Sequence, residues 1–208
     1  INIPTLDYKL RDDGIFVVSL YNFSANSATL FKNAMKKFTA SKSNNLILDL
    51  RGNPGGYLAA AVDMASWFLP GGKTVAIEDY SSEKEKKTYR SAGYNPFGDK
   101  LHMVVLIDEG SASASEILAG ALRDHKRAIL VGDQSYGKGS VQEVVKVTPT
   151  TLFKVTVAKW LTPLGTSISL KGLTPDYVVK FTKDDIAKAK DVQMDKAVEL
   201  LKNWPGIK

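Results

Sequence analysis

The sequence contains no cysteine and only two histidines among its 208 residues. The lack of cysteine excludes disulfide bonds, thiolate metal sites and cysteine nucleophiles. The scarcity of histidine leaves His102 and His125 as the only imidazoles available to a catalytic triad. No apolar run reaches the length of roughly 18 residues that a membrane-spanning helix needs, so the composition predicts no transmembrane segment.

The chain also lacks a strong asymmetry of charge. It has 28 basic and 22 acidic side chains, which give a formal charge of +6. The lysines are dispersed, and the densest charged run, residues 83–87, mixes glutamates with lysines. No basic stripe interleaved with aromatic residues is present, so we expect no nucleic-acid partner. The length and ordinary composition predict that residues 1–208 form a single globular domain.

Short apolar runs alternate with stretches of helical periodicity over most of the chain. Short runs between turn signals indicate buried strands, and i, i+3, i+4, i+7 spacing indicates helices. The expected strands are 15–20, 46–50, 103–107 and 128–132, and the expected helices are 28–38, 58–69 and a helix after 108–110 that ends near 123. The polar residues 79–100 are expected to be an excursion or a loop. Residues 141–147 and 152–161 are expected to be a hairpin, and 184–201 is expected to be a terminal helix. The alternation predicts a parallel α/β sheet with its chemistry in loops at the carboxyl ends of the strands.

The segment 110–116 places three serines among small residues where a strand passes into a helix. Free N–H groups at a helix start favour a nucleophile and an oxyanion hole, and Ser113 is the candidate nucleophile. Taken alone, however, Ser113 and Glu116 have the spacing of a capping box, which is the commoner role of serine at a helix start.

A serine nucleophile needs a base, and neither histidine is well placed for that role. His102 opens a buried strand and His125 follows the end of a helix. A lysine can replace histidine if its environment lowers the pKa from about 10.4 to near 7, and this requires desolvation. Lys138 lies between two glycines before an apolar run, so we expect its stem to enter the interior, with Gln142 on the same face to orient the amine. Taken alone, an exposed lysine in a glycine-rich surface loop is the commoner outcome.

The glycine-rich loop 52–56 follows a predicted strand. Gly55 and Gly56 permit a conformation that aims backbone N–H groups at a carbonyl oxygen, although a simple tight connection to the next helix has the same sequence. Asp49 and Arg51 at the loop entrance are expected to pair and fix its shape. The spacing is not that of a phosphate-binding loop.

Four segments together carry a resemblance to a known family: LILDLRGNPGG (46–56), EGSASASEILAGAL (109–122), YGKGSVQ (136–142) and LTPLGTSISLKGLTPD (161–176). In this order the chain resembles the carboxyl-terminal processing (tail-specific) peptidases. The resemblance implies a crotonase-like α/β sandwich with an additional β-rich C-terminal part and a terminal helix.

The resemblance also implies roles for particular residues. Ser113 is then the nucleophile, Lys138 the base and Gln142 the residue that orients it. The oxyanion hole would combine the amide of Ala114 with an amide of Gly55 or Gly56, without metal or cofactor. The implied activity is endopeptidase cleavage of proteins near their C-termini, at an extracytoplasmic location such as the periplasm or cell envelope.

Family members usually carry a PDZ domain, and no segment here is free to form one. How the tail of a substrate is recognised is therefore left undetermined by the sequence. If the core is latent, we expect it to need an activating partner or the PDZ domain. A different class of function, a non-catalytic peptide- or ligand-binding module on the same scaffold, is the main alternative, and the retained Ser113 and Lys138 argue against it.

Overall fold

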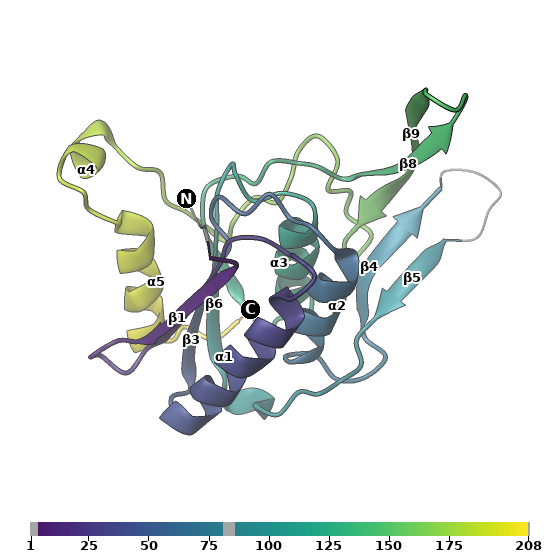
Figure 1. Ribbon diagram of the computed structural model, residues 1–208. Helices are drawn as coiled ribbons and strands as arrows, with labels where there is room; N and C mark the ends of the chain where they lie inside the picture. The colour runs from purple at the N-terminus through teal and green to yellow at the C-terminus, as the bar shows by residue number, and fades with distance from the viewer. Residues whose placement is uncertain (1–3, 81–85, 208) are drawn as a thin grey trace.

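The computed structural model describes residues 4–80 and 86–207 and contains two sheets with helices packed around the first (Figure 1). The elements are β1 (Leu6–Leu10), β2 (Phe16–Leu20), α1 (Ser27–Ser41), β3 (Asn45–Asp49), α2 (Leu58–Ser66), β4 (Thr74–Asp79), β5 (Lys87–Arg90), the 3-10 turn η1 (Gly98–Lys100), β6 (His102–Ile107), α3 (Ala114–Asp124), β7 (Ile129–Gly132), β8 (Ser140–Lys146), β9 (Leu152–Leu161), β10 (Tyr177–Val178), α4 (Lys183–Ala187) and α5 (Val192–Lys202). In this part of the chain, no helix is long and apolar enough to cross a membrane.

The first sheet has the strand order β1-β2-β3-β6-β7-β10. Strands β2, β3, β6 and β7 pair in parallel, as the alternation of apolar runs predicts, and β1 forms an antiparallel hairpin with β2. Neighbouring residues of a strand point to opposite faces, so each strand contributes to two apolar layers. Met103 and Val105 join the cluster under α1, α2 and α3, whereas Val104 and Leu106 join the cluster under α5. Figure 1 shows α5 on the side of the sheet opposite α1 to α3.

The second sheet is antiparallel, in the order β5-β4-β9-β8. The expected hairpin of 141–147 and 152–161 is confirmed as β8 and β9, which project from the body of the molecule beside β4 and β5 (Figure 1). Its strand β8 follows the parallel strand β7 of the first sheet through the segment that contains Lys138. The predicted catalytic lysine therefore lies where the two sheets meet.

Two expectations from the sequence were wrong in detail. Residues 79–100 are not simply a loop, because Lys87–Arg90 forms β5 against β4 and a 3-10 turn follows. Residues 81–85, which include most of the charged run 83–87, lie outside the described part of the chain. The single helix expected at 184–201 is two helices, because Thr182 and Asp191 each cap a separate helix and Ala189 has a positive φ of 50° between them.

Candidate active site

Three loops meet at the carboxyl ends of neighbouring parallel strands. The glycine loop follows β3, the serine loop follows β6, and the lysine loop follows β7. Because β3, β6 and β7 are adjacent and parallel, their carboxyl ends lie at the same edge of the sheet, where α/β proteins place ligands. The topology alone thus brings together three motifs that are up to about 80 residues apart in the sequence.

Ser113 is the residue immediately before α3, and its backbone has an unusual conformation. Its φ is 55° and its ψ is −112°, which is a rare combination for a residue with a side chain and costs about 1–3 kcal/mol. The turn leaves the Ser113 side chain half-buried at the amino end of α3. The next residue, Ala114, is buried, and within the described structure no hydrogen-bond acceptor is found for its N–H. A strained serine beside a free amide at a positive helix end is a suitable arrangement for a nucleophile.

The glycine loop packs directly against this turn. A side chain on Gly55 would lie 2.9 Å from the Ser113 Cβ and 2.6 Å from the Ala112 carbonyl oxygen, and the φ of Gly55 is +95°. Only glycine fits such a close approach without displacement. The Gly55 N–H donates to Asn53 Oδ1 at 2.9 Å. By contrast, the Gly56 N–H is exposed and has no acceptor among the described residues.

Asn53 holds the glycine loop and the serine loop together. It is fully buried, and its Nδ2 donates to the Leu20 carbonyl oxygen at 2.7 Å. Its own carbonyl oxygen accepts the Ala112 N–H at 3.0 Å and the Ser115 hydroxyl at 2.9 Å. The relative position of Ser113 and Gly55 is therefore fixed by hydrogen bonds among backbone groups and the buried side chains of Asn53 and Ser115, and does not depend on exposed side chains.

Glu116 connects the serine loop to the lysine loop and was not identified as a site residue from the sequence. Its carboxylate is fully buried. Oε2 accepts the backbone N–H of Ser113 at 2.8 Å and that of Lys138 at 3.0 Å. Oε1 accepts the Ser135 hydroxyl at 2.6 Å and the Gly137 N–H at 2.7 Å. The capping interpretation was correct for the bond to Ser113, but the same carboxylate also fixes the backbone of the predicted base.

The side chains of Lys138 and Gln142 differ from expectation. Both side chains are exposed, so the expectation that the Lys138 stem enters the interior is wrong for this conformation. No hydrogen bond or ion pair of Lys138 Nζ occurs in the described part of the chain, and none joins it to Ser113. The physical reason is local: both flanking glycines pack against residues 168–172, and this packing fixes the backbone but leaves the side chain outside.

Gln142 lies on β8, next to a β-bulge between Val141 and Gln142. Lys138 precedes the strand, so the simple alternation that would place both side chains on one face does not apply. Their backbones are close in sequence, but within the described residues no hydrogen bond links the two side chains.

The two histidines lie away from the three loops, as the sequence indicates. His102 begins β6, at the opposite end from the serine loop, and its ring stacks on Trp204 with centroids 4.7 Å apart. His125 follows the last residue of α3, and its Nε2 lies 2.7 Å from the Thr74 carbonyl oxygen. Neither imidazole is therefore positioned to serve Ser113.

The predicted pair of Asp49 and Arg51 is confirmed and has a third member. Arg51 makes bonds of 2.9 and 2.7 Å to Asp49 and of 2.8 and 2.9 Å to Asp191, which precedes α5. Burial alone lowers the pKa of Arg51, but the two carboxylates outweigh it, so the pKa is raised and the guanidinium stays charged. The entrance of the glycine loop is thereby attached to the C-terminal helix.

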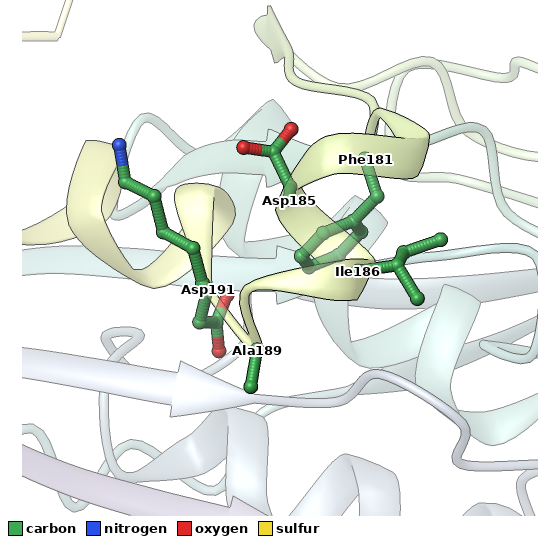
Figure 2. Close-up of a pocket in the computed structure, with 6 residues that line it drawn as sticks. Phe181, Asp185, Ile186, Ala189 and Asp191 are labelled. Carbon is green, nitrogen blue, oxygen red and sulfur yellow. The ribbon is translucent and has the colours of Figure 1, made fainter.

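A separate pocket lies beside α4, and Figure 2 shows Phe181, Asp185, Ile186, Ala189 and Asp191 around it. It contains none of the predicted catalytic residues. Its only connection to the site in the described structure is Asp191, which binds Arg51. The three loops, and not this pocket, therefore form the candidate active site.

Comparison with known proteins defines the class. Residues 14–179 match peptidase family S41, and the chain belongs to this family. A probable CtpA-like serine protease of Staphylococcus haemolyticus is 38% identical over 177 residues, which are 85% of this chain and 35% of that protein. A carboxy-terminal-processing protease of Bartonella bacilliformis is 37% identical over 199 residues, which are 93% of this chain and 45% of that protein.

A solved structure supports the same assignment. The photosystem II D1 C-terminal processing protease superposes with a TM-score of 0.77 at 29% identity, covering 86% of this chain and 49% of that one. The chain thus spans less than half the length of these relatives.

Proposed function

We propose that this chain is the catalytic core of a serine endopeptidase that cleaves protein substrates near their C-termini. Ser113 is the nucleophile, Lys138 the base and Gln142 the residue that orients the base. The observation that carries the proposal is the shared Glu116 Oε2, which binds the backbone N–H groups of Ser113 and Lys138 at 2.8 and 3.0 Å. Because one carboxylate oxygen binds both backbones, Ser113 and Lys138 are neighbours in space whatever rotamers their side chains adopt. Membership of a peptidase family supports the same roles.

The oxyanion hole in this proposal combines the N–H groups of Ala114 and Gly56. Sequence reasoning left Gly55 and Gly56 as alternatives. The N–H of Gly55 already donates to Asn53. The N–H of Gly56 has no acceptor in the described structure, and Gly56 is exposed. Removing one such donor in other enzymes costs about 3–4 kcal/mol of transition-state stabilisation.

The reaction proceeds in two steps that share this hole. The Ser113 Oγ attacks the scissile carbonyl carbon while its proton passes to the neutral amine of Lys138. The tetrahedral oxyanion accepts hydrogen bonds from the two backbone amides. Its collapse breaks the C–N bond, and the proton on Lys138 passes to the leaving amine. Water then attacks the ester, and its proton takes the same route through Lys138 to restore the Ser113 hydroxyl.

In this proposal the Ser113–Lys138 contact forms only on activation, because the Lys138 side chain is exposed in the present conformation. The backbones are already fixed, so rotation of the flexible lysine stem is the movement required. A substrate that covers the site also removes water from the amine and favours its neutral form. We therefore retain latency as part of the proposal: a partner or a PDZ domain that stabilises the closed arrangement would activate the core.

Three broader features belong to the same proposal. The two packed sheets and their helices support a crotonase-like sandwich with residues 1–208 as one domain. The substrates are proteins, in agreement with the family, and their C-terminal segments are the part that binds. An extracytoplasmic location, in the periplasm or cell envelope, is proposed from the resemblance to carboxyl-terminal processing peptidases.

Active-site labelling tests the proposal directly. With its activating partner present, the wild-type chain should be labelled at Ser113 by a serine-directed fluorophosphonate, whereas Lys138→Ala should reduce labelling and peptide cleavage to background. Lys138→Arg should be equally inactive, because arginine keeps the charge but does not deprotonate. Lys146→Ala, an exposed lysine on β8, is the matched control. Activity at the wild-type level in Lys138→Ala would eliminate this lysine as the base.

A non-catalytic peptide-binding module is the alternative, and the exposed Lys138 is the observation in its favour. The two functions predict different results in one assay. A binding module would remain inert to the phosphonate at every pH while it binds peptides tightly. A latent peptidase would be labelled only when its activating partner is present.

A further inference from the structure

An apolar pocket beside the glycine loop has no role in the mechanism described above. It lies between α2 and β5 and has a volume of about 580 Å³. One wall consists of Tyr57, Leu58, Ala59 and Val62, and Tyr89 and Arg90 form part of the other wall. The volume falls within the range of roughly 300–1,000 Å³ that is typical of pockets for organic ligands.

The first wall continues directly from the proposed oxyanion hole. Gly55 packs against Ser113, Gly56 offers its free amide, and Tyr57 and Leu58 follow as the first pocket residues. Phe23 fixes this passage, because its N–H donates to the Gly55 carbonyl oxygen at 2.9 Å and its carbonyl oxygen accepts the Tyr57 N–H at 2.8 Å. The pocket therefore begins one residue after the amide that is proposed to bind the scissile carbonyl.

The second wall connects to the lysine loop. The ring of Tyr89 packs on that of Trp160, with centroids 5.6 Å apart. The backbone N–H of Trp160 donates to the carbonyl oxygen of Gly139 at 2.7 Å, and Gly139 adjoins Lys138. One wall of the pocket is thus tied to the oxyanion loop and the other to the segment that carries the base.

The charged groups at the pocket already have partners. Asp63 accepts a hydrogen bond from the Tyr94 hydroxyl at 2.9 Å, and Arg90 donates to the Gly72 carbonyl oxygen at 2.9 Å. The remaining wall is formed largely by aliphatic and aromatic side chains. Such a surface gains free energy by burying apolar groups and loses it by burying an unpaired charge.

We propose that this pocket binds a large aliphatic or aromatic side chain of the substrate, from a residue flanking the scissile bond. The proposal rests on the proposed peptidase function and adds a substrate preference to it. An extended peptide whose carbonyl oxygen points at the Gly56 and Ala114 amides has a neighbouring side chain beside Tyr57. In such pockets a single methylene group more or less typically changes kcat/KM by about 10- to 200-fold.

The test fills the pocket from two positions. Val62→Trp and Ala59→Trp each place an indole in the cavity, and Ala59 is exposed, so that variant does not disturb the core. The substrates are peptides that differ only by leucine or alanine at successive positions flanking the cut. Both variants should lower the leucine-to-alanine ratio of kcat/KM at one position by about tenfold or more. Lys37→Trp, on the exposed face of α1, should leave this ratio at the wild-type value.

Fluorophosphonate labelling of Ser113 counts the active molecules in every variant and separates the two proposals. If labelled wild-type and variant enzymes cut leucine and alanine peptides with the same ratio, the pocket is not a substrate subsite, although the peptidase function stands. If Ser113 fails to label in the presence of any activating partner and peptides are not cut, the peptidase function fails and this inference fails with it.

Discussion

Arg51, Asp49 and Asp191 form an ion cluster at the entrance of the glycine loop, and its contribution to the free energy of unfolding can be measured by replacing Asp191. Arg51 is nearly enclosed, and the two oxygens of Asp191 lie 2.8 and 2.9 Å from its Nη1 and Nη2. Asp191 also accepts the Met194 N–H at 3.0 Å and so caps α5. Replacing Asp191 by asparagine retains an oxygen acceptor for the cap but removes the charge that faces Arg51.

The expected loss of stability follows from the exposure of the partners. Hydrogen bonds to charged groups contribute about 1.5–3 kcal/mol when they are well buried. The Asp191 side chain is 43% exposed and that of Arg51 17%, so solvent screening reduces the effect. Arg51 also keeps Asp49 as a partner. We therefore expect Asp191→Asn to lower the free energy of unfolding by about 1–2 kcal/mol, and Asp191→Ala to cost about 1 kcal/mol more through loss of the cap.

The pH dependence provides a second check on the same residue. Burial raises the pKa of Asp191, but the hydrogen bonds from Arg51 and Met194 outweigh it, so the pKa lies below its ordinary value. A carboxylate with a depressed pKa stabilises the fold above its unfolded pKa of about 3.9. This contribution is lost as the pH falls through the lower, folded value. The difference between wild type and Asp191→Asn should therefore be constant near neutral pH and shrink in acid.

Denaturant unfolding at low and high salt measures the effect, with Asp195→Asn as the matched control. Asp195 is exposed in the first turn of the same helix, so its replacement makes the same change of charge without touching Arg51. Because the glycine loop is proposed to supply an oxyanion donor, Asp191→Asn should also lower kcat more than it raises KM. Equal unfolding free energies for the two variants would refute the reasoning.

Three further perturbations follow from the site. Gly55→Ala should destabilise the chain by more than about 2 kcal/mol in denaturant unfolding and abolish Ser113 labelling, because φ is +95° and the new Cβ meets backbone atoms. The control Gly165→Ala, at φ +81° in open space, should cost only about 1 kcal/mol in the same measurement. Glu116→Gln should cost about 2–4 kcal/mol in the same measurement, because an amide offers one acceptor to four donors; wild-type stability would show that the carboxylate is not needed. An adjacent arginine side chain lowers the pKa of Asp13 to about 2, so stability attributable to this carboxylate should be present above about pH 4 and lost toward pH 2 in an acid titration, and Asp13→Asn should remove that dependence.

The parallel sheet was predictable because each of its central strands is an apolar run long enough to be buried on both faces. Residues 46–50 and 103–107 have this character, and they became β3 and β6. The strands missed by sequence reasoning include β1 and β4, besides β5 and the two-residue strand β10. The exposed strand β1 alternates weakly. Strand β4 pairs with β5 on one side and on the other with β9, which lies about 80 residues later in the chain. Local patterns do not contain such long-range pairings.

The candidate site was likewise predictable only where local motifs determine it. The motifs predicted that Ser113, Lys138 and the glycine loop matter, and strand adjacency explains why they meet. The additional roles of Glu116 and Asp191 depend on contacts made across 22 and 140 residues of sequence. Glu116 had a visible signal, an acidic residue within a run of small and apolar positions that the helix buries almost completely, but its local capping role accounted for it. Asp191 had no distinguishing signal, because sequence reasoning placed it inside a single helix at 184–201 and its role as the cap of α5 emerges only in the structure.

The shared carboxylate of Glu116 explains why an exposed lysine is compatible with the proposed chemistry. A base held by its own side-chain contacts would have to be buried permanently, and a permanently buried lysine carries a desolvation cost in the resting protein. Here the position of Lys138 is set by its backbone, which the hydrogen bond to Glu116 and the packing of the flanking glycines hold beside Ser113. In the proposed mechanism only the side chain moves, and the desolvation cost arises when substrate is bound and its binding free energy offsets that cost. In this proposal the lysine stem reaches Ser113 only when substrate or a partner covers the site, while the backbones of the two residues stay fixed on Glu116.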